Sequence, residues 1–339
     1  MKTRKVDLAL QGGGSHGAFT WGVLDRILEE ESITIRGTSG TSAGAMNSAV
    51  MASGYAAGGR QGAKDALRAF WKAISEAAVY SPFKRTLLDR AKGKWTLENS
   101  PFFHLAELAG RILSPYDIPG SPSNPLKPVL EKFVDFSAIS DGPIKVFITA
   151  TNVRTGRGRV FHGTELSVDV LLASACLPTL FKSVVIDGEA YWDGGYSGNP
   201  TLTPLIRECD SDDTILVQIN PIHRPEVPTS AYDIQSRLNE ISFNAVLQQE
   251  LRMMSLLRRA TTTDDSEGGL WGRQRLHRIG SDLMLTLGYS SKLNAEWDFL
   301  QMLFEEGRKC GDEFIKNHGK DIGVRSTLDL DSFLEGVDI

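Results

Sequence analysis

"ITIRGTSGTSAGAMNSAV", residues 33–50, combines a β-branched apolar segment, a glycine-rich turn and a run of small residues. We expect a strand over 33–40 that leads through the turn directly into a helix. The turn contains Gly40, Ser42 and Gly44, the G-x-S-x-G spacing in which many hydrolases present a serine nucleophile. Small neighbours let the chain bend tightly, and a helix N-terminus favours the negative charge that develops when an ester is attacked.

The preceding residues predict the same succession of elements. "VDLAL" (6–10) has the length and residue types of a buried strand, "QGGGSHG" (11–17) follows at once, and the apolar spacing of 17–30 predicts a helix. Two consecutive strand–glycine turn–helix units are typical of an α/β fold with parallel strands.

Gly12, Gly14 and Gly17 have the G-x-G-x-x-G spacing, which is compatible with two functions. In a dinucleotide-binding fold the loop would hold a pyrophosphate, and an acidic residue at the end of the second strand would bind the ribose. The acidic cluster at 29–31 lies instead at the end of the first predicted helix. In a hydrolase the same unobstructed amides would form an oxyanion hole. One glycine loop beside one serine turn favours acyl transfer.

The remaining chain alternates predicted strands and helices without a repeat or a linker, and we expect one domain over 1–339. Strands are expected over 144–153 and 212–219, a hairpin over 184–195 with its turn at Asp187-Gly188, and helices over 166–178, 233–260 and 296–319. The core motifs lie within 5–220, and 221–339 is expected to be a helical extension packed on that core. Residues 261–269 are polar and predict a mobile loop. Residues 79–103 predict either a lid over the site or a helix-packing segment, and the sequence leaves open whether a lid would extend over 79–125.

Composition excludes several classes of protein. The formal net charge of −5, the isoelectric point near 5.8 and the absence of a basic stripe argue against a nucleic-acid partner. Three cysteines without metal-binding spacing suggest a reducing compartment. No signal-peptide pattern and no apolar run of roughly 20 residues is present, so we expect a cytoplasmic protein.

The predicted amphipathic helix 233–260 could face either the core or a lipid surface. Its apolar stripe consists of Ile241, Val246, Leu247, Leu251 and Met254.

A serine hydroxyl needs a base, and spacing alone leaves its identity open. Among the six histidines, His223 has the best position in the chain, because it follows a strand late in the sequence. His16 lies within the glycine loop and suits a cation or hydrogen-bond donor near the oxyanion better than a base. Asp193 is the other candidate, since it follows a predicted strand and precedes Gly194 and Gly195. A carboxylate is a weaker base than imidazole but can accept the proton directly from the hydroxyl.

Three segments taken together, "QGGGSHG", "GTSAG" and "ASACLPTLFKSVVIDGEAYWDGGYSGNP" (173–200), resemble the patatin-like phospholipase family. The resemblance implies a three-layer α/β/α sandwich with a mainly parallel sheet. It also implies a lipid acyl hydrolase that uses a Ser–Asp dyad and needs no metal or cofactor. Ser42 would be the nucleophile, Asp193 the proton acceptor, and Gly12, Gly13 and Gly14 the oxyanion hole, with Gly17, Gly40, Gly44, Gly194 and Gly195 supporting the motifs.

The chain departs from the family pattern at one position. The family usually has Arg or Lys where His16 stands, and a neutral imidazole would give the loop less positive charge. The implied partner is a lipid or acyl-ester substrate, and transient contact with a membrane surface is compatible with it. An inactive scaffolding relative and a dinucleotide-binding oxidoreductase are the alternative functions.

Overall fold

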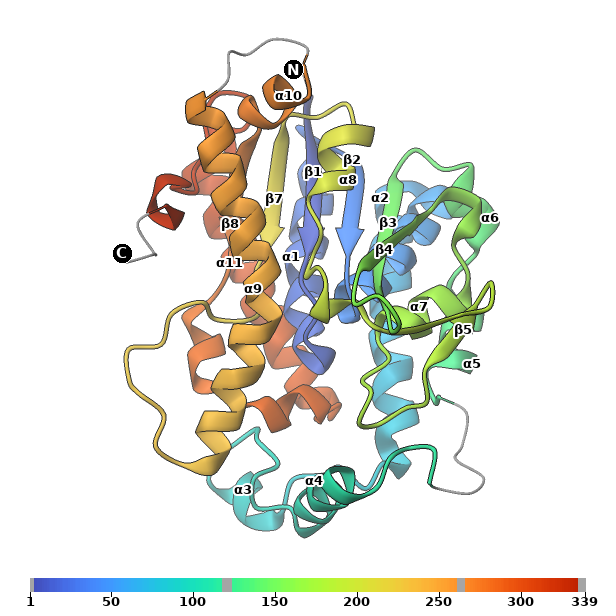
Figure 1. Ribbon diagram of the computed structural model, residues 1–339. Coiled ribbons are helices and arrows are strands. Elements are labelled where there is room, and N and C mark those ends of the chain that lie inside the picture. Colours follow the sequence, from blue (N-terminus) through green and yellow to red (C-terminus); the bar gives the residue numbers. More distant parts are fainter. Residues whose placement is uncertain (1–2, 118–123, 261–265, 335–339) are drawn as a thin grey trace.

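The computed structural model describes residues 3–117, 124–260 and 266–334, and its central feature is a mixed sheet in the order β5-β6-β3-β2-β1-β7-β8 (Figure 1). The strands are β1 (Arg4–Leu10), β2 (Ile33–Gly40), β3 (Lys145–Asn152), β4 (Gly158–His162), β5 (Val184–Ile186), β6 (Glu189–Asp193), β7 (Asp213–Val217) and β8 (Arg275–Ile279). Strands β3, β2, β1, β7 and β8 pair in parallel. Strands β4 and β6 both pair antiparallel with β3, and β5 continues from β6.

Helices cover both faces of this sheet (Figure 1). They are α1 (Gly17–Glu29), α2 (Ala43–Ala77), α3 (Leu87–Ala91), α4 (Pro101–Ile112), α5 (Lys127–Phe133), α6 (Phe136–Ser140), α7 (Val168–Ser174), α8 (Thr203–Glu208), α9 (Ala231–Ala260), α10 (Glu267–Gly272) and α11 (Trp297–His318). Helix α2 follows Ser42 as expected, and its helical geometry is interrupted at Gly58 and Gly59.

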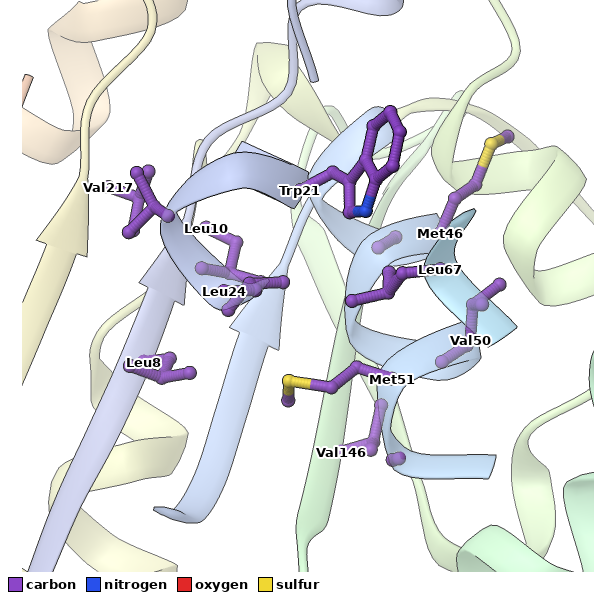
Figure 2. Close-up of a cluster of buried hydrophobic side chains, with 14 of the residues drawn as sticks. Leu8, Leu10, Trp21, Leu24, Met46, Val50, Met51, Leu67, Val146 and Val217 are labelled. Atoms are coloured by element: carbon purple, nitrogen blue, oxygen red, sulfur yellow. The ribbon is translucent and has the colours of Figure 1, made fainter. Parts of the chain in front are cut away.

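Alternation along the central strands creates two apolar cores, one on each face. Leu8 and Leu10 of β1 point to the face covered by α1, α2 and α11, where they meet Trp21 and Met51 (Figure 2). Ala9, between them in sequence, points to the opposite face and packs with side chains of α8, α9 and α10. The α/β/α sandwich expected from the sequence is therefore confirmed.

Two strands were not expected from the sequence. Strand β4 is a short antiparallel partner of β3. Strand β8 lies within 221–339 and extends the parallel sheet beyond β7, so this part of the chain is not only a helical extension. Of the polar loop expected over 261–269, residues 261–265 lie outside the described residues, and α10 begins at Glu267. The hairpin turn is as expected, with positive φ at Asp187 and Gly188.

Helix α9 only partly follows the stripe expected for it. Leu247, Leu251 and Met254 are buried, whereas Ile241 is exposed and Val246 is half-buried. In the described part of the chain, no helix combines the length and the apolar character needed to span a bilayer.

Candidate active site

Ser42 occupies a sharp turn between β2 and α2. Its φ of 54° and ψ of −120° lie in a region that non-glycine residues rarely adopt, as expected for a nucleophile held at the tip of a strand-to-helix turn. Glycines make this turn possible: a Cβ on Gly44 would lie 2.1 Å from the Leu10 carbonyl oxygen, and one on Gly40 would lie 2.4 Å from the Gly44 carbonyl oxygen. The Ser42 backbone N–H donates to Ser174 Oγ at 2.9 Å, which fixes the turn against α7.

Asp193 lies at the end of β6, and the fold brings its carboxylate beside Ser42, whose hydroxyl acts to lower the Asp193 pKa. The Gly195 N–H donates to Asp193 Oδ1 at 2.7 Å, which orients the carboxylate. No side chain fits at the two following positions, since a Cβ would lie 2.0 Å from the Thr149 carbonyl oxygen at Gly194 and 2.2 Å from the Phe243 ring at Gly195. Two residues predicted from separate motifs therefore form one pair.

The protonation of this carboxylate is set mainly by burial. Asp193 is 1% exposed, and burial raises its pKa to about 7, against opposing effects from the Gly195 N–H, the Ser42 hydroxyl and the charge of Lys292. A pKa near neutrality suits a general base, because the carboxylate is then substantially ionised at neutral pH and still basic enough to take a proton.

The glycine loop lies directly against Ser42. A Cβ on Gly12 would lie 2.8 Å from Ser42 Cβ, so only glycine allows this approach. The Gly12 N–H, however, donates to Asn199 Oδ1 at 2.7 Å and is occupied. The N–H groups of Gly13 and Gly14 have no hydrogen-bond partner among the described residues, and Gly14 has a φ of 57°. These two amides are the ones available to an oxyanion.

A buried polar network holds the loop in place. Gln11 Nε2 donates to the Asn199 carbonyl oxygen and to Asn244 Oδ1, while Gln11 Oε1 accepts from the backbone N–H groups of Ile219 and Asn220. Asn220 Nδ2 in turn donates to the Gly12 carbonyl oxygen at 2.9 Å. The loop is thus anchored to the end of β7, outside the three motifs that the sequence singled out.

His16 makes no hydrogen bond to Ser42 or Asp193 among the described residues. Its ring is 3% exposed, lies edge-on to Phe299, and has Nε2 2.7 Å from Ser291 Oγ. Burial and the neighbouring Lys292 lower the pKa of His16 to about 3, so the imidazole is neutral. A neutral imidazole argues against His16 as a cation near the oxyanion, and its role as a hydrogen-bond donor stays a prediction. His223 is exposed after β7 and makes no hydrogen bond to Ser42 or Asp193 among the described residues.

Lys292 is the site residue that the sequence did not reveal. Its ammonium donates to Asn220 Oδ1 and Asn239 Oδ1, both at 2.8 Å. Burial lowers the pKa of Lys292 to about 8, against the opposing charges of Glu240 and Asp193. A Cβ on Gly14 would lie 2.4 Å from the Lys292 carbonyl oxygen. The family's loop cation is absent at His16, and Lys292 brings a positive charge to the same loop from a different part of the chain.

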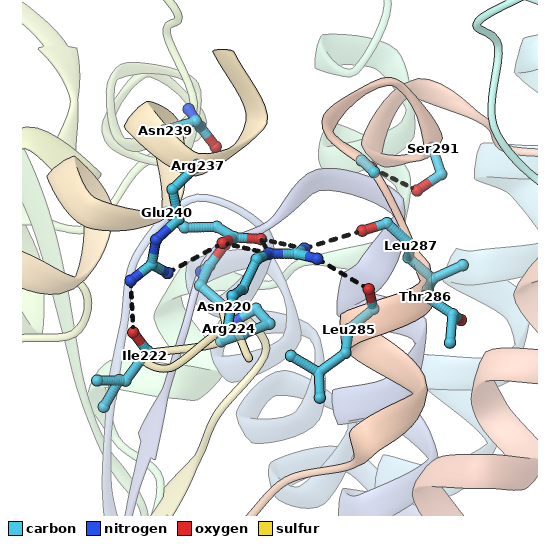
Figure 3. Close-up of polar contacts among 12 residues, drawn as sticks. Asn220, Ile222, Arg224, Arg237, Asn239, Glu240, Leu285, Thr286, Leu287 and Ser291 are labelled. Atoms are coloured by element: carbon cyan, nitrogen blue, oxygen red, sulfur yellow. Dashed lines mark hydrogen bonds and ion pairs between the residues drawn. The ribbon is translucent and has the colours of Figure 1, made fainter. Parts of the chain in front are cut away.

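An ion-pair cluster fixes the segments around Lys292 (Figure 3). Glu240 of α9 pairs with Arg224 and Arg237. Arg224 also donates to the carbonyl oxygens of Leu285 and Leu287, and Arg237 donates to that of Ile222. The cluster ties together α9, the chain after β7 and the chain before Lys292. In the described residues, no group of His, Cys, Asp and Glu side chains is arranged to hold a metal ion.

Comparisons with known proteins identify a family by sequence. The sequence model of the patatin-like phospholipases matches residues 8–206, which include the glycine loop, the serine turn and the Asp-Gly-Gly motif. Among solved structures, VipD from Legionella pneumophila is similar, with 15% sequence identity, a TM-score of 0.37, and coverage of 91% of this chain and 67% of that one. No curated protein matches the chain by sequence.

Proposed function

Because this chain belongs to the patatin-like phospholipase family, a family of lipid hydrolases, we propose that it cleaves fatty-acyl esters through an acyl-serine intermediate formed on Ser42. The observation that carries the proposal is the position of the buried Asp193 carboxylate beside the Ser42 hydroxyl. It joins a strained nucleophile turn to a base whose pKa lies near 7, with no histidine between them.

In the proposed reaction the Asp193 carboxylate accepts the hydroxyl proton while Ser42 Oγ attacks the ester carbonyl carbon. The tetrahedral intermediate collapses when the alcohol leaves with the proton from Asp193, and the acyl group remains on Ser42. Asp193 then takes a proton from a water that attacks the acyl carbon, and returns it to Ser42 Oγ as the acyl–oxygen bond breaks and the fatty acid is released. The chemistry requires neither a metal nor a cofactor.

The N–H groups of Gly13 and Gly14 are the proposed donors to the oxyanion. Preorganised donors of this kind are each worth about 3–4 kcal/mol in the transition state. Gly12 contributes in a different way, since its N–H holds Asn199 and its lack of a side chain lets the loop approach Ser42. Lys292 adds a buried positive charge close to His16, the position of the usual cation.

The direct test is hydrolysis of p-nitrophenyl acyl esters and phospholipids together with labelling by a fluorophosphonate. The wild-type chain should turn over and be labelled on Ser42, and Ser42→Ala should lose both. Ser242→Ala, which removes an exposed hydroxyl on α9, is the matched control and should retain both. Folded wild-type protein that neither hydrolyses these esters nor reacts with the probe would support a scaffolding function instead.

A further inference from the structure

Exposed apolar side chains are concentrated in one segment of the chain. Nine of the eighteen large apolar residues exposed in the described residues lie between positions 79 and 116: Val79, Leu87, Leu88, Phe102, Leu105, Leu108, Ile112, Leu113 and Tyr116. Soluble proteins rarely leave such apolar clusters uncovered unless they bind something.

Helix α4 presents its apolar side chains in an ordered way. Leu105, Leu108 and Ile112 are 63%, 57% and 75% exposed and follow one another at a spacing of three and four residues, so they share a face of the helix. In the same segment, α3 exposes Leu87 and Leu88 at 83% and 67%. Both short helices thus display leucines to solvent.

Residues 79–116 contain six Lys and Arg residues and three acidic residues, Asp89, Glu98 and Glu107. Lys84, Lys92 and Lys94 are exposed, and within the described ranges no carboxylate lies at ion-pair distance from Lys92 or Lys94. Asp89, the acidic residue of α3, is buried and accepts from Thr86 and Asn99. The surface is therefore basic on a chain whose formal net charge is −5.

This segment spans the end of the molecule that carries the active site. Trp95 stacks on Phe299, which packs against His16 of the glycine loop, and the Leu97 N–H donates to Ser290 Oγ. At the other end of the segment, the Tyr116 hydroxyl lies 2.8 Å from Ser183 Oγ, in the chain between α7 and β5. Figure 1 shows α3 and α4 beyond the carboxyl ends of the parallel strands, where Ser42 also lies.

We propose that residues 79–116 form a docking surface for anionic phospholipid bilayers, with the leucines of α3 and α4 entering the interface and Lys84, Lys92 and Lys94 binding the headgroups. Anionic lipid headgroups would supply the negative charge that complements the lysines. The acyl region of the bilayer would supply an apolar environment for the leucines. A second copy of the chain fits less well, since a twofold contact would place one set of lysines against another. Docking itself needs no catalysis, so only the purpose of docking, access to lipid substrates, rests on the proposed function.

The test measures flotation of the protein with phospholipid vesicles. The protein carries Ser42→Ala so that the vesicles stay intact, and the vesicles contain phosphatidylcholine alone or mixed with phosphatidylglycerol. We expect binding to the mixed vesicles that weakens with added salt. Leu105→Ser/Leu108→Ser/Ile112→Ser should bind roughly tenfold more weakly or worse, and Lys92→Glu/Lys94→Glu roughly 30-fold more weakly.

The matched control is Leu256→Ser/Val324→Ser, which removes exposed apolar side chains outside the surface and should bind like the parent. Hydrolysis of soluble p-nitrophenyl butyrate by the same surface variants with Ser42 intact reports folding and the proposed function separately, and should stay unchanged. Equal binding to both kinds of vesicle, equal loss in the control, or no vesicle binding while butyrate is still hydrolysed would overturn the docking proposal. A dimer in solution that the leucine variant dissociates would assign the surface to a second copy.

Discussion

Replacing Asp193 by asparagine should stabilise the folded protein while removing its proposed base. Asparagine has nearly the same shape, and its side-chain oxygen can still accept the Gly195 N–H. Burial raises the Asp193 pKa from 3.8 to about 7, so the native state binds this proton more tightly than the unfolded state does. Ionisation therefore costs native stability: the free energy of unfolding falls as pH rises from about 4 to 7 and then stays level.

The size of the effect follows from the same two pKa values. At about 1.4 kcal/mol for each tenfold difference in proton affinity, the step from 3.8 to about 7 costs about 4 kcal/mol above pH 7 and roughly half of that near pH 5.5. Asparagine carries no such cost. At roughly 2 °C per kcal/mol for a chain of this length, Asp193→Asn should melt on the order of 8 °C higher near pH 8.5 and on the order of 4 °C higher near pH 5.5.

Thermal unfolding followed by circular dichroism at both pH values measures this difference. The control is Asp65→Asn, which removes an exposed carboxylate on α2 and should shift the melting temperature little at either pH. A gain for Asp193→Asn that does not grow with pH, or no gain at alkaline pH, would show that the carboxylate is not desolvated as described.

Three further predictions concern activity. The rate of ester hydrolysis should rise with pH with a midpoint near 7, because only ionised Asp193 can accept the Ser42 proton; a pH–rate profile already level at pH 5 would contradict this. Lys292→Met should move that midpoint to higher pH, because it removes a charge that lowers the Asp193 pKa, whereas Lys292→Arg keeps the charge and should not. Identical pH–rate profiles for the two variants would show that the Lys292 charge does not affect the Asp193 pKa. His16→Ala should cost activity through lost packing without moving the midpoint, and full loss of activity in the folded variant would restore a direct role for His16.

Residues close together in sequence were the ones that could be predicted. The turn around Ser42 and the hairpin ending at Asp193 are local structures that require glycine for steric reasons. A Cβ would lie 2.1 Å from a backbone oxygen at Gly44 and 2.0 Å from one at Gly194. The alternation of strand, turn and helix likewise follows from short-range apolar spacing. Pairing of Ser42 with Asp193 needed the family resemblance, because spacing alone left a histidine equally good.

The residues that could not be predicted depend on long-range contacts. Lys292 lies in a stretch without a motif, and its role arises only when it packs against Gly14 and pairs with Asn220. Asn199 is visible in the sequence beside the Asp-Gly-Gly motif, but nothing local shows that it takes the Gly12 N–H. Strand β8 has only two apolar residues, Leu276 and Ile279, which do not alternate, and its central His277 is buried, so no strand pattern distinguished it from a loop.

The position of β1 in the sheet limits where this chain can be truncated. Strand β1 is paired on one side with β2 and on the other with β7, and β7 lies beyond the residues that match the family. A fragment ending near residue 206 would turn β1 from an interior strand into an open edge, with its backbone N–H and C=O groups free to pair with another chain. Such a fragment would contain the serine, the aspartate and the glycine loop, yet we expect it to aggregate rather than fold.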